Sequence, residues 1–122
     1  MSKLPLALLL AIAAAPVLAR DGAVPAATPV GEAVDCIPTV GMRSHVRSDR
    51  VIDFVAGRNV YRNTLPDACP SLGFEARFSY RLNTSRLCSV DIITVLQGPG
   101  IAPGASCGLG KFQPVEIAKA AR

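Results

Sequence analysis

The sequence has a single histidine, His45, and lacks any close pair of cysteines. Its four cysteines, Cys36, Cys69, Cys88 and Cys107, lie 33, 19 and 19 positions apart. A structural zinc site draws its ligands from close pairs such as Cys-x-x-Cys, so this spacing predicts no metal site. A hydrolytic triad needs a histidine that is held by a carboxylate and faces a nucleophile, which one isolated histidine does not establish. We therefore expect no cofactor, no metal and no enzyme activity.

The chain also lacks a hydrophobic run long enough for a membrane helix. Residues 4–19 are apolar, but this stretch is shorter than the roughly 20 residues that a bilayer requires, and Pro16 interrupts it. The stretch follows a charged start and ends in Val17-Leu18-Ala19, which predicts an export signal at residues 1–19. No cysteine follows it directly, so we expect neither a lipid anchor nor a transmembrane segment after cleavage. The predicted location is periplasmic or secreted.

Blocks of like charge are absent as well. The whole chain carries +4, and removing residues 1–19 takes away one lysine and leaves about +3. This mild excess differs from the charge runs of a nucleic-acid-binding tail. The expected arginine face, described below, also lacks the aromatic side chains that stack on single-stranded nucleic acid. We expect no nucleic-acid partner.

What the sequence does have is a series of short β-strand patterns. Alternating or β-branched segments separated by glycine- and proline-rich turns predict an all-β domain, with no convincing helix. The expected organisation is a flexible Ala/Pro/Gly leader at 20–34, one β domain at 35–117 and a tail at 118–122. About six strands are expected in an up-and-down meander, curled into an open barrel or sandwich. They span residues 42–47, 51–56, 60–65, 74–82, 87–96 and 112–117, the last an edge strand because of Pro114.

Two hairpins have predictable registers. Gly57-Arg58 suits a two-residue turn and places Phe54 opposite Tyr61 and Asp53 opposite Arg62. In the central hairpin, the match of apolar residues favours pairing 78 with 92 and 80 with 90. Residues 97–104, rich in glycine and proline, are expected to form an irregular loop.

Four cysteines in an exported chain predict two disulfides. In a simple meander, Cys36 and Cys88 lie at one end of the sheet, and Cys69 and Cys107 lie at the other. Because bridged residues need Cα atoms within about 7 Å, the expected pairs are Cys36–Cys88 and Cys69–Cys107. One missing or extra strand would reverse this argument and favour Cys69–Cys88.

The polar residues offer three candidate sites, each with an alternative. Asp53, Asp67 and Asp91 could supply the carboxylate pair of a glycoside hydrolase, although cross-strand ion pairing explains them more simply. The glycines at 104–110 resemble a phosphate-binding loop, but their spacing is one residue too long and Phe112 replaces the magnesium-binding hydroxyl. Arg62, Arg77 and Arg81 could bind phosphate, sulfate or carboxylate on the outer face of the sheet, unless neighbouring acidic residues neutralise them.

Several segments together resemble a family of small exported bacterial proteins that is filed as a domain of unknown function. The segments are Asp35-Cys36-Ile37-Pro38, Tyr61-Arg62-Asn63-Thr64-Leu65-Pro66, Cys69-Pro70-Ser71-Leu72, Leu87-Cys88-Ser89-Val90-Asp91 and Cys107-Gly108-Leu109-Gly110. The resemblance covers 35–115 and implies a disulfide-stapled domain in the cell envelope, with no catalytic residues to transfer.

The function expected from these observations is a non-catalytic envelope module that binds a partner or stabilises an assembly. The alternative is a small secreted inhibitor or anion-binding protein, acting through the 97–106 loop or through Arg62, Arg77 and Arg81. The partner would be an envelope protein or an anionic surface.

Overall fold

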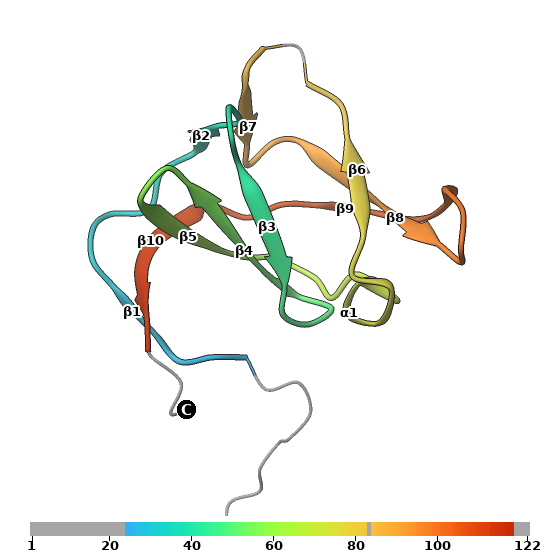
Figure 1. Ribbon diagram of the computed structural model, residues 1–122, viewed down its shortest axis with the longest axis horizontal. Helices are drawn as coiled ribbons and strands as arrows, with labels where there is room; N and C mark the ends of the chain where they lie inside the picture. Colours follow the sequence, from blue (N-terminus) through green and yellow to red (C-terminus); the bar gives the residue numbers. More distant parts are fainter. Residues whose placement is uncertain (1–23, 83, 119–122) are drawn as a thin grey trace, which may run out of the picture.

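The structure is a computed structural model that describes residues 24–82 and 84–118. It contains ten strands and one short helix, arranged in three antiparallel sheets (Figure 1). The elements are β1 (Ala27–Pro29), β2 (Cys36–Pro38), β3 (Arg43–Val46), β4 (Val51–Ala56), β5 (Asn59–Thr64), α1 (Leu72–Glu75), β6 (Phe78–Tyr80), β7 (Arg86–Cys88), β8 (Ile92–Gln97), β9 (Ala102–Gly108) and β10 (Phe112–Ile117). The predicted all-β class is confirmed. The expected export signal at 1–19 and most of the expected tail at 118–122 lie outside the described residues.

The largest sheet has five strands in the order β1-β10-β5-β4-β3. Its β4–β5 hairpin has the predicted register, with Asp53 opposite Arg62 and Phe54 opposite Tyr61. Gly57 opens the two-residue turn with φ 66°, a left-handed conformation that glycine adopts without steric cost. Turn chemistry therefore determined this part of the fold locally.

Two expected irregular segments are strands instead. Ala27–Pro29, within the predicted flexible leader, forms β1 and pairs with β10. Ala102–Gly108, partly within the predicted loop, forms β9 and pairs with β8 around an irregularity between Thr94 and Leu96. As a result β10 is not the expected edge strand: it lies between β1 and β5, and the carbonyl of Pro114 accepts a hydrogen bond from Val30.

The predicted central hairpin is wrong in both length and register. Phe78 lies opposite Val95 and Tyr80 opposite Ile93, three positions away from the expected pairing. Residues 72–75 form α1, because Leu72 is fully buried and the chain turns around it, which leaves Phe74 87% exposed. The second expected strand also divides in two. Asp91 accepts the Cys88 N–H at 2.7 Å and closes a turn between β7 and β8.

The three sheets share one hydrophobic core. Its fully buried side chains come from the five-stranded sheet, from the three-stranded sheet β6-β8-β9 and from the pair β2-β7. Phe54 of β4 meets Phe78 of β6 and Phe112 of β10 edge to face, with ring centroids 6.2 and 5.5 Å apart. The layers are thus joined directly through aromatic contacts, although the strands do not form the single meander expected.

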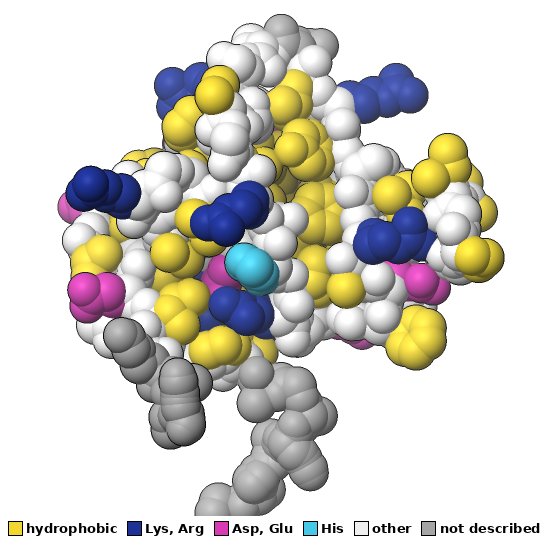
Figure 2. Space-filling view, viewed as in Figure 1, with side chains coloured by type: hydrophobic (Ala, Val, Ile, Leu, Met, Phe, Trp, Pro, Cys, Tyr) yellow, Lys and Arg dark blue, Asp and Glu magenta, His cyan; other side chains and the backbone are white. Residues whose placement is uncertain are grey.

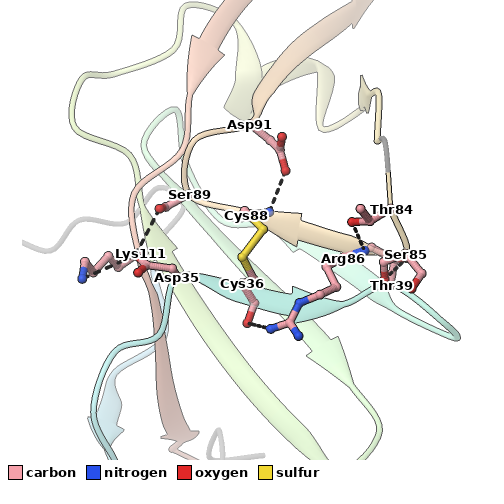
Figure 3. The surroundings of a disulfide bond; sticks show 10 residues. All are labelled: Asp35, Cys36, Thr39, Thr84, Ser85, Arg86, Cys88, Ser89, Asp91 and Lys111. Carbon is pink, nitrogen blue, oxygen red and sulfur yellow. Dashed lines mark hydrogen bonds and ion pairs between the residues drawn. A yellow bond between two sulfur atoms is a disulfide. The ribbon is translucent and has the colours of Figure 1, made fainter.

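Both predicted disulfides are present. Cys36 and Cys88 lie directly opposite each other in the β2–β7 pair, with Cα atoms 4.0 Å apart (Figure 3). Cys69 and Cys107 join the segment after β5 to β9, with Cα atoms 5.9 Å apart. Two disulfides indicate an oxidising, extracytoplasmic environment. Within residues 24–82 and 84–118, no helix is long and apolar enough to cross a membrane.

Candidate functional site

The strongest concentration of charge lies on the five-stranded sheet, on the face turned away from the core. Along β3 and the residue that follows it, the alternation of side chains places Arg43, His45 and Arg47 on this face. Register then places His45 beside Asp53 of β4, and Asp53 beside Arg62 of β5. We call Arg43, His45, Arg47 and Arg62, around Asp53, the cationic face. Figure 2 shows basic side chains and the histidine gathered around a partly covered acidic group over β3 and β4.

Asp53 is the centre of this face and is fully buried. Arg62 donates from Nε to Asp53 Oδ1 at 2.8 Å and from Nη2 to Oδ2 at 2.9 Å. Arg47 donates from Nε to the same Oδ2 at 2.8 Å. Burial would raise the pKa of Asp53, but hydrogen bonds and attraction from Arg62 and Arg47 together outweigh it and lower that pKa below 3.8. Asp53 is therefore an ionised anchor that fixes two guanidinium groups.

The charges on the cationic face do not balance. Asp53 is its one carboxylate, against the guanidinium groups of Arg43, Arg47 and Arg62. Arg43 and His45 are exposed, and the side chains of Arg47 and Arg62 are 27% and 15% exposed. Among the described residues, the hydrogen bonds of the two guanidinium groups use three of their N–H donors. Fixed donors and excess positive charge thus meet at one surface.

The three arginines predicted as one cluster are not brought together. Arg62 lies in the five-stranded sheet, whereas Arg77 and Arg81 flank β6 of the three-stranded sheet. Arg77 donates to the carbonyl oxygens of Gly98, Gly100 and Leu96, so it holds the β8–β9 turn. The neighbouring acidic residues Glu75 and Asp91 form no ion pair with Arg77 or Arg81 in the described part of the chain.

Arg81 contributes to a separate, open groove of about 490 Å³ on the outer face of the three-stranded sheet. Both polar and apolar residues line the groove. They include Ser79, Arg81, Asp91, Ile92, Thr94 and Pro103. The Thr94 and Ser106 hydroxyl groups are 2.9 Å apart beside it. One oxygen of Asp91 is already committed to the Cys88 N–H, as Figure 3 shows.

The candidate catalytic groups remain apart. Asp53 is held by two arginines, Asp91 closes a turn, and Asp67 is exposed in the connection after β5. The Ser48 hydroxyl oxygen accepts the backbone N–H groups of residues 50 and 51 and so holds the turn between β3 and β4. No group of three potential metal ligands occurs among residues 24–82 and 84–118.

The glycine-rich segment at 104–110 has a packing role around Asn63. The buried Asn63 side chain donates to the Gly110 carbonyl at 2.7 Å and accepts the Gly110 N–H at 2.7 Å. A β-carbon on Gly110 would overlap with the carbonyl oxygen of Thr64. The close approach of two backbones therefore explains this glycine.

Sequence reasoning identified Asp53 and Arg62 but missed the contributions of Arg43 and Arg47. The signal was present, because strand alternation over the expected strand 42–47 places both arginines and His45 on one face. What was not predicted was the register between that strand and β4. Comparison of the chain with family models, curated proteins and solved structures finds no match. The resemblance to the exported bacterial family stays a prediction.

Proposed function

We propose that this protein is an exported, non-catalytic binding module of the cell envelope, which recognises an anionic group of its partner through the cationic face. The observation that carries the proposal is that three arginines and a histidine surround a single carboxylate, which is buried. The expected export signal at residues 1–19 and the two disulfides support a periplasmic or secreted location.

The arrangement favours a carboxylate, sulfate or phosphate as ligand. Arginine presents planar, forked donors that match the oxygens of these groups. Asp53 holds Arg47 and Arg62 in place before any ligand arrives, which lowers the entropy lost on binding. Arg43 and His45 are exposed at the rim, where they can approach an anion without uncovering Asp53.

Immobilised dextran sulfate tests this proposal as a generic anionic probe at low salt. We expect Arg43→Glu to weaken retention strongly, because it reverses one charge on the cationic face while leaving the Asp53 hydrogen bonds in place. Arg86→Glu makes the same change in charge on β7, outside the face, and serves as the matched control. Equal losses in the two variants would show that only net charge matters and would overturn the assignment of the site.

A specific observation also favours the alternative function, a small secreted inhibitor. The turn between β8 and β9 carries Ile101, which is 77% exposed. Arg77 holds this turn through the carbonyl oxygens of Gly98 and Gly100, and Glu75 accepts the Gly98 N–H at 3.3 Å. A pre-ordered turn with an exposed apolar side chain suits insertion into an enzyme cleft.

Inhibition of an enzyme captured from periplasmic extract would test this second function. An inhibitor should capture one dominant enzyme and reduce its activity, and Ile101→Glu should abolish both effects. Val90→Glu makes the same kind of change at another exposed site, 84% accessible, and should abolish neither. Capture without inhibition would contradict an inhibitory role.

A further inference from the structure

Two free strand edges border the core between the sheets. β3 is the last strand of the five-stranded sheet, and β6 is the first strand of the three-stranded sheet. In the view of Figure 1, β3 and β6 lie next to each other at the margins of these two sheets. In the described part of the chain, no backbone hydrogen bond joins β3 to β6.

The backbone of β3 has groups available at this edge. In an antiparallel pair, successive residues direct their N–H and C=O groups alternately toward the partner strand and away from it. The Arg47 N–H donates to the Val51 carbonyl oxygen, on the side of β4. By alternation along the β3–β4 register, Ser44 and Val46 direct their backbone groups toward the free edge.

The backbone of β6 also has groups available at its outer edge. The Leu96 N–H donates to the Arg77 carbonyl oxygen, on the side of β8. By alternation along the β6–β8 register, Phe78 and Tyr80 direct their backbone groups toward the free edge of β6. Both edges thus present donors and acceptors that no described strand pairs, with the spacing of a strand.

We call the strip of surface between β3 and β6 the seam. The side chains along it are apolar and form its floor (Figure 2). Partly buried apolar side chains in or next to these two strands pack against the core: Met42 and Val46 at β3, and Phe78, Tyr80 and Leu82 at β6. Figure 2 shows hydrophobic side chains along the strip between the two sheets. Partial exposure of large apolar side chains beside open strand edges is typical of a surface that receives another strand.

Positive charge flanks the seam on its solvent side. Arg43 of β3 and Arg47, directly after β3, project on the cationic face. Arg81 follows β6 and lies opposite in phase to Tyr80, so it points away from the core. A strand placed between the edges would alternate in the same way, with one set of side chains over the apolar floor and the other set among these arginines.

We propose that the partner recognised by the cationic face supplies an extended segment of alternating apolar and acidic residues, which binds between β3 and β6. This inference rests on the proposed function, because the acidic side chains would be the anionic groups that the cationic face receives. Main-chain hydrogen bonds to Ser44, Val46, Phe78 and Tyr80 would provide affinity, and the alternation of side chains would provide specificity. The segment would join the two sheets across the seam.

Charge complementarity favours such a partner over a second copy of this chain. The chain is itself basic, at +4, and its cationic face would repel the same face of another molecule. A polysaccharide would satisfy the arginines but would match neither the apolar floor nor the regular row of backbone groups.

A short peptide in which glutamate and valine alternate is the probe. We expect it to slow amide exchange at Ser44, Val46, Phe78 and Tyr80, where no other strand protects these groups. Peptides of the same composition in block order, and alternating peptides with lysine in place of glutamate, should fail to do so. Exchange unchanged by the alternating peptide would overturn the inference.

Ser44→Pro isolates the backbone contribution. Its N–H points to the free edge, so proline removes no hydrogen bond to β4 and is tolerated as in other edge strands. We expect peptide affinity to fall about tenfold, the loss that one main-chain hydrogen bond accounts for, while dextran sulfate retention stays unchanged. Undiminished peptide binding by this variant would place the peptide elsewhere and contradict the inference.

The two proposals fail differently. Retention on dextran sulfate without peptide binding would overturn the inserted strand and leave anion recognition intact. Failure of both probes would overturn both proposals. Protection of the same four amides without peptide, in a sample that sediments as a dimer, would show that a second copy occupies the seam and would overturn the proposed partner.

Discussion

Asp53 is a charged residue in a position that usually excludes charge. It is fully buried, yet it accepts three hydrogen bonds from two guanidinium groups. A buried carboxylate without such partners would be strongly destabilising. Its pairing with Arg62 was predictable, because a two-residue turn determines which residues of β4 and β5 face each other. Its pairing with Arg47 depends on the packing of β3, which no local signal determines.

We expect Asp53→Asn to lower the free energy of unfolding by about 2–3 kcal/mol. Breaking a fully buried ion pair typically costs about 3–5 kcal/mol. The expected loss is smaller here because both arginine side chains are partly exposed to solvent. Urea denaturation followed by circular dichroism measures the change. Asp67→Asn, at an exposed position, is the control and should change stability by less than about 0.5 kcal/mol. Equal stability of the wild type and Asp53→Asn would show that the ion pairs contribute nothing net.

Lowering the pH should remove the contribution of the Asp53 ion pairs to stability over a defined pH range. The pKa of Asp53 is lower in the folded protein than its ordinary value of 3.8, so folding favours the ionised form. The contribution is complete above the unfolded pKa and is lost as pH falls through the lowered folded pKa. We therefore expect the stability difference between the wild type and Asp53→Asn to be constant near neutrality and to shrink below about pH 4. A difference that grows in acid would contradict the lowered pKa.

Gly110 illustrates a residue selected by contact distance alone. A β-carbon on Gly110 would overlap with the Thr64 carbonyl oxygen. The N–H group of Gly110 donates to the Asn63 side chain, and its carbonyl oxygen accepts a hydrogen bond from the same side chain. We expect Gly110→Ala to cost about 2–3 kcal/mol, because the backbone at Gly110 must move away from the Thr64 carbonyl group. Gly108→Ala is the matched control, since a β-carbon there meets nothing within 4 Å. Thermal unfolding of the two variants measures the contrast, and similar melting temperatures would contradict it.

At the scale of elements, the sequence predicted the strands whose hydrogen-bond partners lie close in the chain. The β4–β5 hairpin follows from Gly57 and from the alternation on either side of it. The stretch from 74 to 96 has an equally clear alternation, but its strands are shortened because Leu72 and Leu87 are fixed in the core by distant elements. An apolar pattern selects the buried face of a strand; where the strand stops depends on what packs against it.

The β8–β9 turn depends on a single side chain from another element. Arg77 donates hydrogen bonds to three carbonyl oxygens there. Hydrogen bonds from charged donors are stronger than those from neutral donors. We therefore expect Arg77→Ala to raise the rate of amide exchange at Gln97 and Ala102 about tenfold. Arg81→Ala, which removes the same group beyond the other end of β6, should leave these amides unchanged. Native-state hydrogen exchange measures both. A local effect equal in the two variants would show that Arg77 does not hold the turn.

At the scale of the whole molecule, the two disulfides have different tasks. Cys36–Cys88 lies within one strand pair, whereas Cys69–Cys107 connects the end of the five-stranded sheet to the three-stranded sheet. The pairing was predicted correctly from a meander that the structure does not contain as a whole, since β10 returns to the first sheet. The prediction succeeded because the ends at which the cysteines lie were correct, even though the strand order was not.

Chain entropy assigns each disulfide about 4 kcal/mol, because the two loops are of similar length. Cys69 is also fully buried, so we expect the double alanine variant of Cys69 and Cys107 to lose more stability than that of Cys36 and Cys88. Urea denaturation of both variants measures the difference. A larger loss in the Cys36/Cys88 variant would show that the small β2–β7 pair, and not the link between sheets, limits stability.

The position of β10 determines when the five-stranded sheet can be completed during synthesis. Among the described residues this strand follows every other strand along the chain, yet it lies inside the five-stranded sheet and contributes Phe112 to the core. A polypeptide synthesised from its N-terminus therefore leaves β1, and the edge of β5 that is not paired with β4, without the neighbour β10 until residues 112–117 emerge. The five-stranded sheet can therefore be completed only after residues 112–117 have been synthesised.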